Sequence, residues 1–76
     1  MTDITLKDLP VGEQARVSRL LAVGAVRRRF MDLGLIDGTL VKSVFAGPSG
    51  NPVAYEIRGA LVAIRGEDSA QILVQI

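Results

Sequence analysis

The alternation of apolar and polar residues predicts short β-strands over most of the chain. Within residues 14–20, Ala15 and Val17 share one face while Arg16 and Ser18 share the other, which is the period-two pattern of a half-buried strand. Four further segments combine apolar residues with flanking turn signals and are also predicted to be strands: residues 39–46, 53–58, 60–65 and 71–76.

One segment shows the periodicity of a helix, which we expect over residues 24–34. Three apolar residues are spaced i, i+4 and i+7 and so share one helix face: Val26, Phe30 and Leu33. Gly34 follows directly, where the left-handed conformation that ends many helices favours glycine. Arg28 and Asp32 lie four residues apart, so they are expected to pair on the helix surface.

Turn residues separate these elements. Asp37-Gly38 precedes the second strand, and residues 47–52 contain two prolines and two glycines, which is typical of a loop. Several short strands joined by such turns predict an all-β barrel. We therefore expect a single domain over residues 1–76, with about five strands and one short helix inserted between strands 1 and 2.

Composition limits the chemistry of this domain. The 76 residues include no cysteine and no histidine, so disulfides and the common pairs of nucleophile and imidazole base are excluded. The ligands that favour transition metals are missing too. Residues 47–50 contain a proline and lack the Lys-Ser/Thr ending of a phosphate-binding loop. We expect no catalytic residue, no cofactor and no metal site, and therefore no enzyme.

Charge and hydropathy bear on location and partners. The formal net charge is +1, from nine basic and eight acidic residues, whereas nucleic-acid-binding domains are usually clearly basic. Residues 1–4 lack the basic region and apolar run that begin a signal peptide. No apolar stretch approaches the roughly 18 residues that span a bilayer. We expect a cytoplasmic protein with no nucleic-acid partner.

The apolar content is high for so small a chain. Hydrophobic residues make up 49% of the sequence, while a domain of this size buries only about 60% of its unfolded surface. Three residues are expected to point outward from their strands and to form an apolar contact surface: Leu40, Phe45 and Leu61. The other interpretation is that a bulge in the strand returns these residues to the core.

The run Arg27-Arg28-Arg29 is the most obvious charge feature. Three consecutive helical residues spread over about 200° of the helix circumference, so they do not form a single stripe. The run is either a solvated helix face or a contact for an acidic surface. We take Arg27 and Arg28 as candidate partner-binding residues, which set the orientation of a partner around the apolar surface.

Three motifs in the chain resemble the FeoA family over nearly the whole length. They are Leu6-x-x-Leu9-x-x-Gly12, the block Arg28-Arg29-Phe30-Met31-Asp32-Leu33-Gly34-Leu35-x-x-Gly38, and the loop Pro48-Ser49-Gly50-Asn51-Pro52. The resemblance implies an SH3-like barrel that acts in ferrous iron uptake. It also implies a protein partner, the cytoplasmic GTPase region of a FeoB-type transporter, whose assembly or activity the domain modulates. Contact with the membrane is then only indirect, through that transporter.

A similar barrel forms the C-terminal domain of iron-dependent repressors of the DtxR type. The alternative function is therefore a stand-alone regulatory or oligomerisation module, in which the apolar surface is buried against an identical copy. Either function relies on binding rather than on catalysis. Whether binding activates or restrains a transporter is left open by the sequence.

Overall fold

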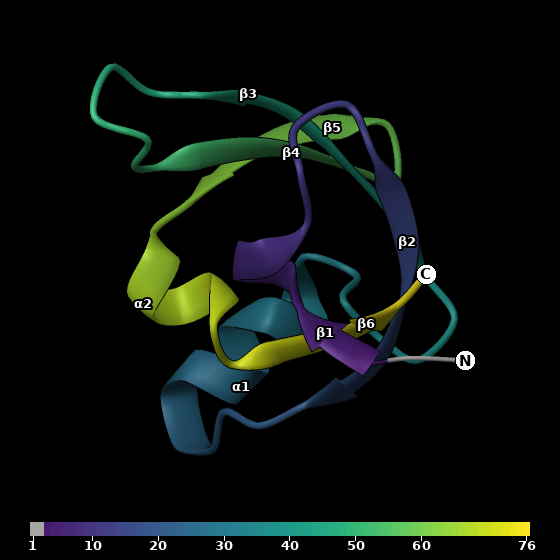
Figure 1. Ribbon diagram of the computed structural model, residues 1–76. Helices are drawn as coiled ribbons and strands as arrows, with labels where there is room; N and C mark the ends of the chain where they lie inside the picture. The colour runs from purple at the N-terminus through teal and green to yellow at the C-terminus, as the bar shows by residue number, and fades with distance from the viewer. Residues whose placement is uncertain (1–2) are drawn as a thin grey trace.

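The computed structural model describes residues 3–76 of the chain, and it is mostly β-structure (Figure 1). Met1 and Thr2, which belong to the stretch examined for a signal peptide, lie outside the described residues. The elements in chain order are β1 (Asp3–Thr5), the 3-10 helix η1 (Leu6–Asp8), β2 (Gln14–Leu20), α1 (Gly24–Asp32), β3 (Leu40–Ala46), β4 (Val53–Ile57), β5 (Ala60–Ile64), α2 (Gly66–Ser69) and β6 (Ile72–Gln75).

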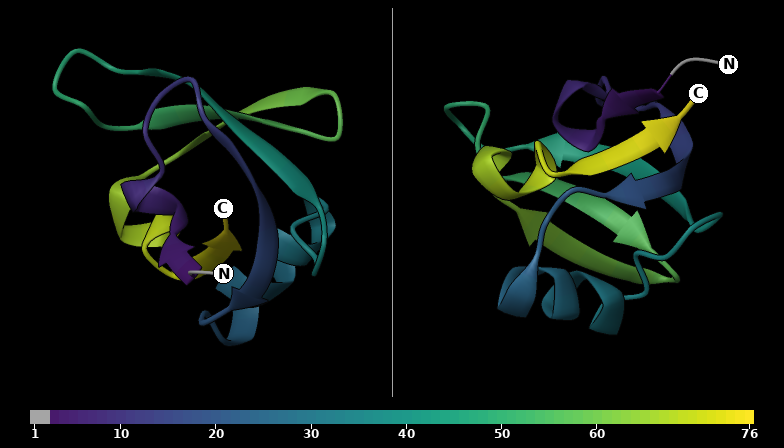
Figure 2. Two further views of the ribbon diagram at one scale, coloured as in Figure 1. Left: turned by 45° about the vertical axis from the view of Figure 1, so that its right-hand side comes forward. Right: turned by 90° about the horizontal axis from the view of Figure 1, so that it is seen from below.

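The six strands form one antiparallel sheet in the order β1-β6-β2-β3-β4-β5. The sheet curls around the core, and β2 takes part in both halves because it pairs with β3 and with β6 (Figure 2). The helix α1 follows β2 and lies at the opposite end of the molecule from the β3–β4 hairpin (Figure 1). The strands β1 and β5 are the two edges of the sheet.

The prediction of about five strands was one too few, because β1 was not recognised. This strand has three residues and pairs with the end of β6, from Asp3 opposite Gln75 to Thr5 opposite Leu73. A segment of three residues is too short to show alternation. The 3-10 helix η1 follows this strand directly.

Side chains from all six strands, and from the helical and loop segments between them, pack in or against the core. Its largest fully buried members are Leu6, Val17, Phe30, Leu35, Val41, Tyr55, Ile57, Ile64, Ile72 and Val74. The predicted inward residues of β2, Ala15 and Val17, are both buried. The Tyr55 hydroxyl donates a hydrogen bond to the Leu6 carbonyl oxygen at 3.3 Å, so the core also ties β4 to η1.

The helix α1 contributes less to the core than its periodicity predicted. Phe30 is fully buried, but Val26 is 37% exposed and Leu33 is only half-buried. The chain reverses at Gly34, whose φ is +93°, and the next residue, Leu35, is fully buried. The helix therefore contacts the core mainly through its last turn.

The predicted ion pair between Arg28 and Asp32 is absent from the described residues. The ion pair that α1 does form joins Arg29 Nη2 to Asp68 Oδ2 of α2, at 3.8 Å. A pair this long and with Arg29 largely exposed adds little stability. It connects two helices that lie far apart in the sequence.

Candidate functional site

The three residues predicted to point outward are all exposed. Their exposed fractions are 42% for Leu40, 53% for Phe45 and 58% for Leu61. They lie on β3 and β5, on the side of the sheet that faces away from the core. The residues that share these strands and point inward, Val41 and Ile64, are buried.

A bulge in β3 explains why Phe45 is exposed. The register with β4 runs from Ser43 opposite Tyr55 to Phe45 opposite Ala54, so Val44 is an extra residue. Directly opposed residues project to the same side of a sheet, and neighbouring residues project to opposite sides. Because Tyr55 points into the core, Ala54 and Phe45 point away from it. The bulge considered from the sequence is present, but it exposes Phe45 instead of returning it to the core.

The three exposed residues do not form one patch. In the outer rows of the sheet, Phe45 lies beside Ala54 and Ala63, while Leu61 lies beside Glu56 and Lys42. We call the apolar group on this face the sheet patch: Val44, Phe45, Leu61 and Ala63, with Ala54 almost covered between them.

Leu40 stands apart from the sheet patch. It lies opposite Arg16 of β2, and the charged residues Lys42 and Glu56 occupy the next outer row of the sheet. With Lys42, Glu56 and Arg58 it lines a shallow hollow at the tip of the β4–β5 hairpin. Charged side chains therefore separate Leu40 from the other two residues of the expected surface, Phe45 and Leu61. The sequence did not predict this separation, because the pattern within one strand does not show which residues lie opposite on the next.

A second apolar surface surrounds α1 and was missed in the sequence. Its exposed members are Leu21, Val23, Val26, Met31 and Ile36, and Val23 is the most exposed at 80%. We call it the helix surface. Arg27 and Arg28 are exposed on the same helix and line a hollow there with Gly24, Met31 and Asp32. This hollow contains no member of the sheet patch, whereas Arg29 lines another hollow with Ala63 of that patch.

A groove runs between α1 and β2 within the helix surface. Apolar side chains, among them Leu20, Met31 and Ile36, form most of its lining, and Arg19 and Arg27 line it as well. The Arg27 Nη1 donates a hydrogen bond to the Leu20 carbonyl oxygen at 3.4 Å. This contact links the helix to β2, which ends at Leu20.

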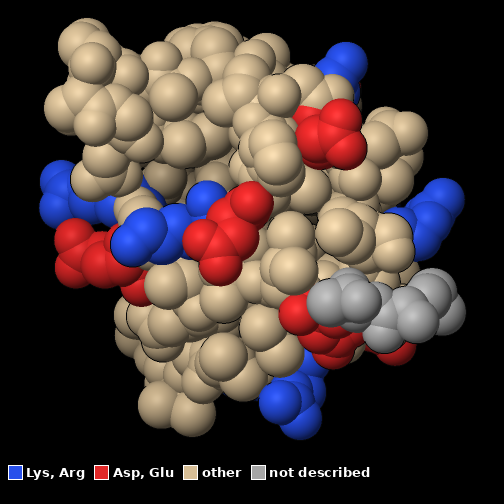
Figure 3. Space-filling view, in the orientation of Figure 1, with Lys and Arg blue, Asp and Glu red and all other residues tan. Residues whose placement is uncertain are grey.

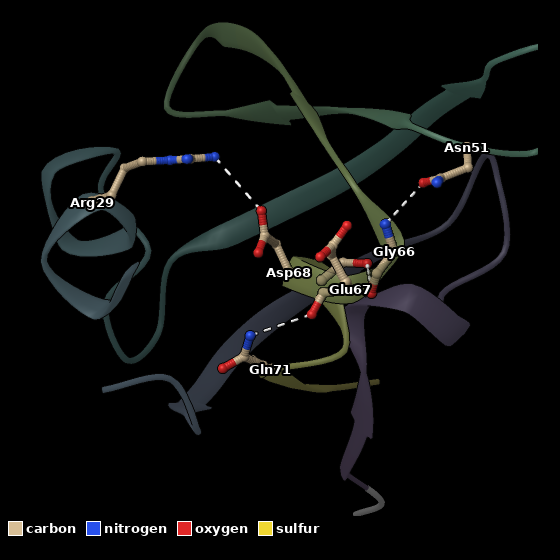
Figure 4. Close-up of polar contacts among 7 residues, drawn as sticks. Arg29, Asn51, Gly66, Glu67, Asp68 and Gln71 are labelled. Atoms are coloured by element: carbon tan, nitrogen blue, oxygen red, sulfur yellow. Dashed lines mark hydrogen bonds and ion pairs between the residues drawn. The ribbon is translucent and has the colours of Figure 1, made fainter. Parts of the chain in front are cut away.

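Charged side chains gather at the left and centre of the face shown in Figure 3, below a broad uncharged area at the upper left that includes the loop between β3 and β4. Residues of η1, of the β3–β4 loop, of β4 and of α2 line a polar hollow, among them Lys7, Asn51, Tyr55, Glu67 and Ser69. Figure 4 shows how the loop is tied to α2: the Gly66 backbone N–H donates to Asn51 Oδ1 at 2.8 Å. Residues of η1, of the loop between β3 and β4, and of α2 thus border the hollow.

Tyr55, which lines the polar hollow, is not suited to act as a general base. Tyr55 forms its floor and is almost fully buried. Burial raises the pKa of the Tyr55 hydroxyl above its usual value of 10.0, and the neighbouring Ser69 hydroxyl opposes this rise. A raised pKa keeps the phenol protonated at neutral pH, which is unsuited to a general base.

Residues 3–76 contain neither a cluster of metal-ligating side chains nor a membrane-spanning helix. Nowhere in this range do three His, Cys, Asp or Glu side chains come close enough together to hold a metal ion. None of the described helices has the length and the apolar character needed to cross a bilayer.

Comparison with known proteins gives a consistent result. A family model described as FeoA domain matches residues 4–76. A curated relative, the Fe(2+) transport protein A/Fe(2+) transporter FeoB fusion protein of Porphyromonas gingivalis, is 34% identical over 71 residues. The matched region covers 93% of this chain and only 8% of that relative.

Solved structures share the fold. The FeoA protein of Chlorobium tepidum is 37% identical with a TM-score of 0.89, covering 96% of this chain and 70% of that chain. A zinc-complexed FeoA of Stenotrophomonas maltophilia, described as an SH3 domain protein, is 28% identical with a TM-score of 0.86, covering 95% and 89%. The IdeR protein of T. acidophilum is 21% identical with a TM-score of 0.85, covering 100% of this chain and 35% of that chain, a likeness that concerns the fold alone.

Proposed function

The chain belongs to the FeoA family, and from this membership we propose that it is a cytoplasmic accessory protein of ferrous iron uptake. In this proposal it binds the GTPase region of a FeoB-type transporter and modulates the assembly or activity of that transporter. It acts by binding and not by catalysis. The alternative, a regulatory module related to the DtxR-type repressors, is supported only by likeness of fold.

The observation that carries the proposal is the fusion protein of Porphyromonas gingivalis. Its name joins Fe(2+) transport protein A and FeoB in one polypeptide, and the matched region of this chain is 34% identical to it. Linking two modules gives each a high effective concentration for the other. A covalent link is useful when the two modules act together, which supports an association between separate chains as well.

The sheet patch is the surface that we assign to the transporter. Phe45 and Leu61 are more than half exposed, and aromatic and large apolar residues often supply most of the binding energy of an interface. Lys42 and Glu56 flank the patch and provide a polar rim. Leu40 lies beyond this rim and makes a smaller contribution in this arrangement.

Titration of the protein with the soluble GTPase portion of a FeoB-type transporter, with and without nucleotide, tests the proposal. We expect binding by the natural protein and at least a hundredfold loss with Phe45→Asp, because a carboxylate would be desolvated in the contact. Val23→Asp is the matched control, since Val23 is exposed directly before α1 and its substitution is expected to leave binding unchanged. Equal affinity of a folded Phe45→Asp variant would rule out the sheet patch, and no binding by the natural protein would overturn the proposed function.

A further inference from the structure

The strand β5 is an edge strand without the usual protection against pairing. It pairs with β4 on one side only, and no strand lies beyond it in Figure 2. Its five residues, Ala60–Ile64, include no charge and no proline, and its register with β4 contains no bulge. Edge strands usually carry such features because these features block further pairing. By contrast, the other edge, β1, has only three residues and begins with Asp3.

The hairpin between β4 and β5 fixes which backbone groups of β5 are free. Its two loop residues, Arg58 and Gly59, have positive φ angles of 52° and 85°, which is the geometry of a two-residue type I′ turn. The flanking pair, Ile57 and Ala60, therefore exchanges hydrogen bonds, and such pairs alternate along the ladder.

Two residues of β5 fall in the positions that are not bonded to β4. Leu61 lies opposite Glu56 and Ala63 opposite Ala54, one and three positions beyond the hydrogen-bonded pair at the turn. Their N–H and C=O groups point away from β4. No backbone hydrogen bond from the loops or turns of residues 3–76 reaches them. They are available to a further strand.

We propose that the occupant of this edge is a second copy of the chain, paired antiparallel through β5 about a two-fold axis at Val62. This register places Leu61 opposite the partner's Ala63, and Ala63 opposite the partner's Leu61. Both are positions with free groups, so the two strands exchange four N–H···O=C bonds. Such self-complementarity is what a two-fold interface requires.

The side chains fit this register. Leu61 and Ala63 are both exposed on the outer face, so each large side chain meets a small one across the axis. The outer row that starts at Phe45 and passes through Ala54 and Ala63 continues into the partner's Leu61. Pairing thus extends the sheet patch across both copies. A strand from an unrelated protein has no reason to match this large–small alternation.

The dimer is compatible with transporter binding but does not depend on it. Strand pairing uses the edge of β5 and leaves the outer face of the sheet open. Two paired strands of five residues bury less surface area than the roughly 1,600 Å² of a standard interface. We therefore expect a weak dimer, with a dissociation constant on the order of 100 µM. Tests of the purified protein alone therefore judge this inference separately from the proposed function.

Sedimentation equilibrium between about 10 µM and 1 mM tests the inference, combined with proton–nitrogen NMR spectra over the same range. We expect the mean mass to rise towards the dimer and the amide signals of Leu61 and Ala63 to shift with concentration. Ala63→Lys places a charge beside the partner's Leu61 and weakens the dimer at least tenfold. Ala25→Lys makes the same change on α1, where Ala25 is exposed, and leaves the dimer unchanged.

A second variant separates pairing from side-chain effects. Ala63→Pro removes an N–H that points away from β4, so the β4–β5 ladder keeps its hydrogen bonds while the edge loses a donor. We expect a folded monomer. A natural protein that is monomeric at 1 mM overturns the inference, as does a dimer that persists in Ala63→Lys. Shifts of Leu61 and Ala63 only after addition of the transporter's GTPase portion also overturn it, because the edge then receives a strand of that partner.

Discussion

The side chain of Arg58 lies directly against Gly34, so that a β-carbon at position 34 would overlap the Arg58 Cδ. This contact joins the tip of the β4–β5 hairpin to the end of α1. Gly34 is buried, and its φ of +93° is a conformation that glycine adopts without strain. Glycine therefore suits this position for its backbone angle, and it leaves space that the exposed Arg58 side chain would have to vacate for a larger residue.

Gly34→Ala is expected to destabilise the protein by about 3 kcal/mol, from the left-handed backbone and the overlap together. Gly38→Ala is the matched control, because Gly38 has a φ of +89° and open space around its Cα. The control is expected to lose only the backbone share, about 1–2 kcal/mol. Urea unfolding of both variants and of Gly34→Ala/Arg58→Ser measures the difference. Equal losses in the two single variants, or no recovery in the double variant, would contradict a steric role for Arg58.

Ser43 is a buried polar residue whose removal is expected to stabilise the fold. It is fully buried on β3 opposite Tyr55, and its Oγ has no hydrogen-bond partner among the described residues. A buried hydroxyl without a partner costs about 1–3 kcal/mol. Ser43→Ala should raise the free energy of unfolding by about 1 kcal/mol in urea titrations. Ser49→Ala is the control, because Ser49 is exposed. A lower free energy of unfolding for Ser43→Ala would show that the Ser43 hydroxyl has a hydrogen-bond partner.

Tyr55 makes stability depend on alkaline pH. Burial raises the pKa of its hydroxyl above 10.0, so the folded protein holds this proton more tightly than the unfolded chain does. The resulting stabilisation is complete below pH 10 and is lost as the pH rises through the raised value, with a slope of up to about 1.4 kcal/mol per pH unit. Tyr55→Phe should remove this part of the slope in urea unfolding from pH 8 to 11. It should also cost about 1 kcal/mol at pH 7, since the bond to Leu6 is lost. Parallel pH curves for the two proteins would contradict this account.

The strands were predictable where alternation extends over five or more residues, as in β2 and β4. The exposure of Leu40 and Leu61 also followed from alternation, because Val41 and Ile64 take the inward positions. The three residues of β1 gave no pattern, and the bulge at Val44 depends on pairing with β4, which a single strand does not reveal.

The candidate site was less predictable than the fold. The sheet patch depends on cross-strand neighbours: Ala54 and Ala63 continue the apolar row from Phe45, while Lys42 and Glu56 interrupt it near Leu40. The helix surface was missed because the i, i+4, i+7 pattern assigned Val26 to the core. The signal that could have revealed it was the apolar pair Leu21 and Val23, which precedes the helix and has no counterpart in its periodicity.

The arginines of α1 lead to a prediction about rates of binding. Arg27 and Arg28 lie on the helix surface, away from the sheet patch, so we propose that they steer the encounter with an acidic transporter surface without taking part in the contact. Exposed charges of this kind change the association rate and its salt dependence more than the dissociation rate. In contrast, Phe45 is assigned to the contact itself, so Phe45→Asp should mainly raise the dissociation rate.

Arg27→Glu/Arg28→Glu is therefore expected to slow association with the transporter's GTPase portion about fivefold to tenfold at low salt. The dissociation rate should stay within twofold, and the difference in association should nearly vanish at about 0.5 M salt, where the screening length is only a few ångströms. Surface plasmon resonance at both salt concentrations measures the two rates. Arg27→Gln/Arg28→Gln serves as the graded control and should fall between the natural protein and the charge reversal. A dissociation rate that rises with the charge reversal would place the two arginines inside the contact and would move the docking surface from β3 and β5 to α1.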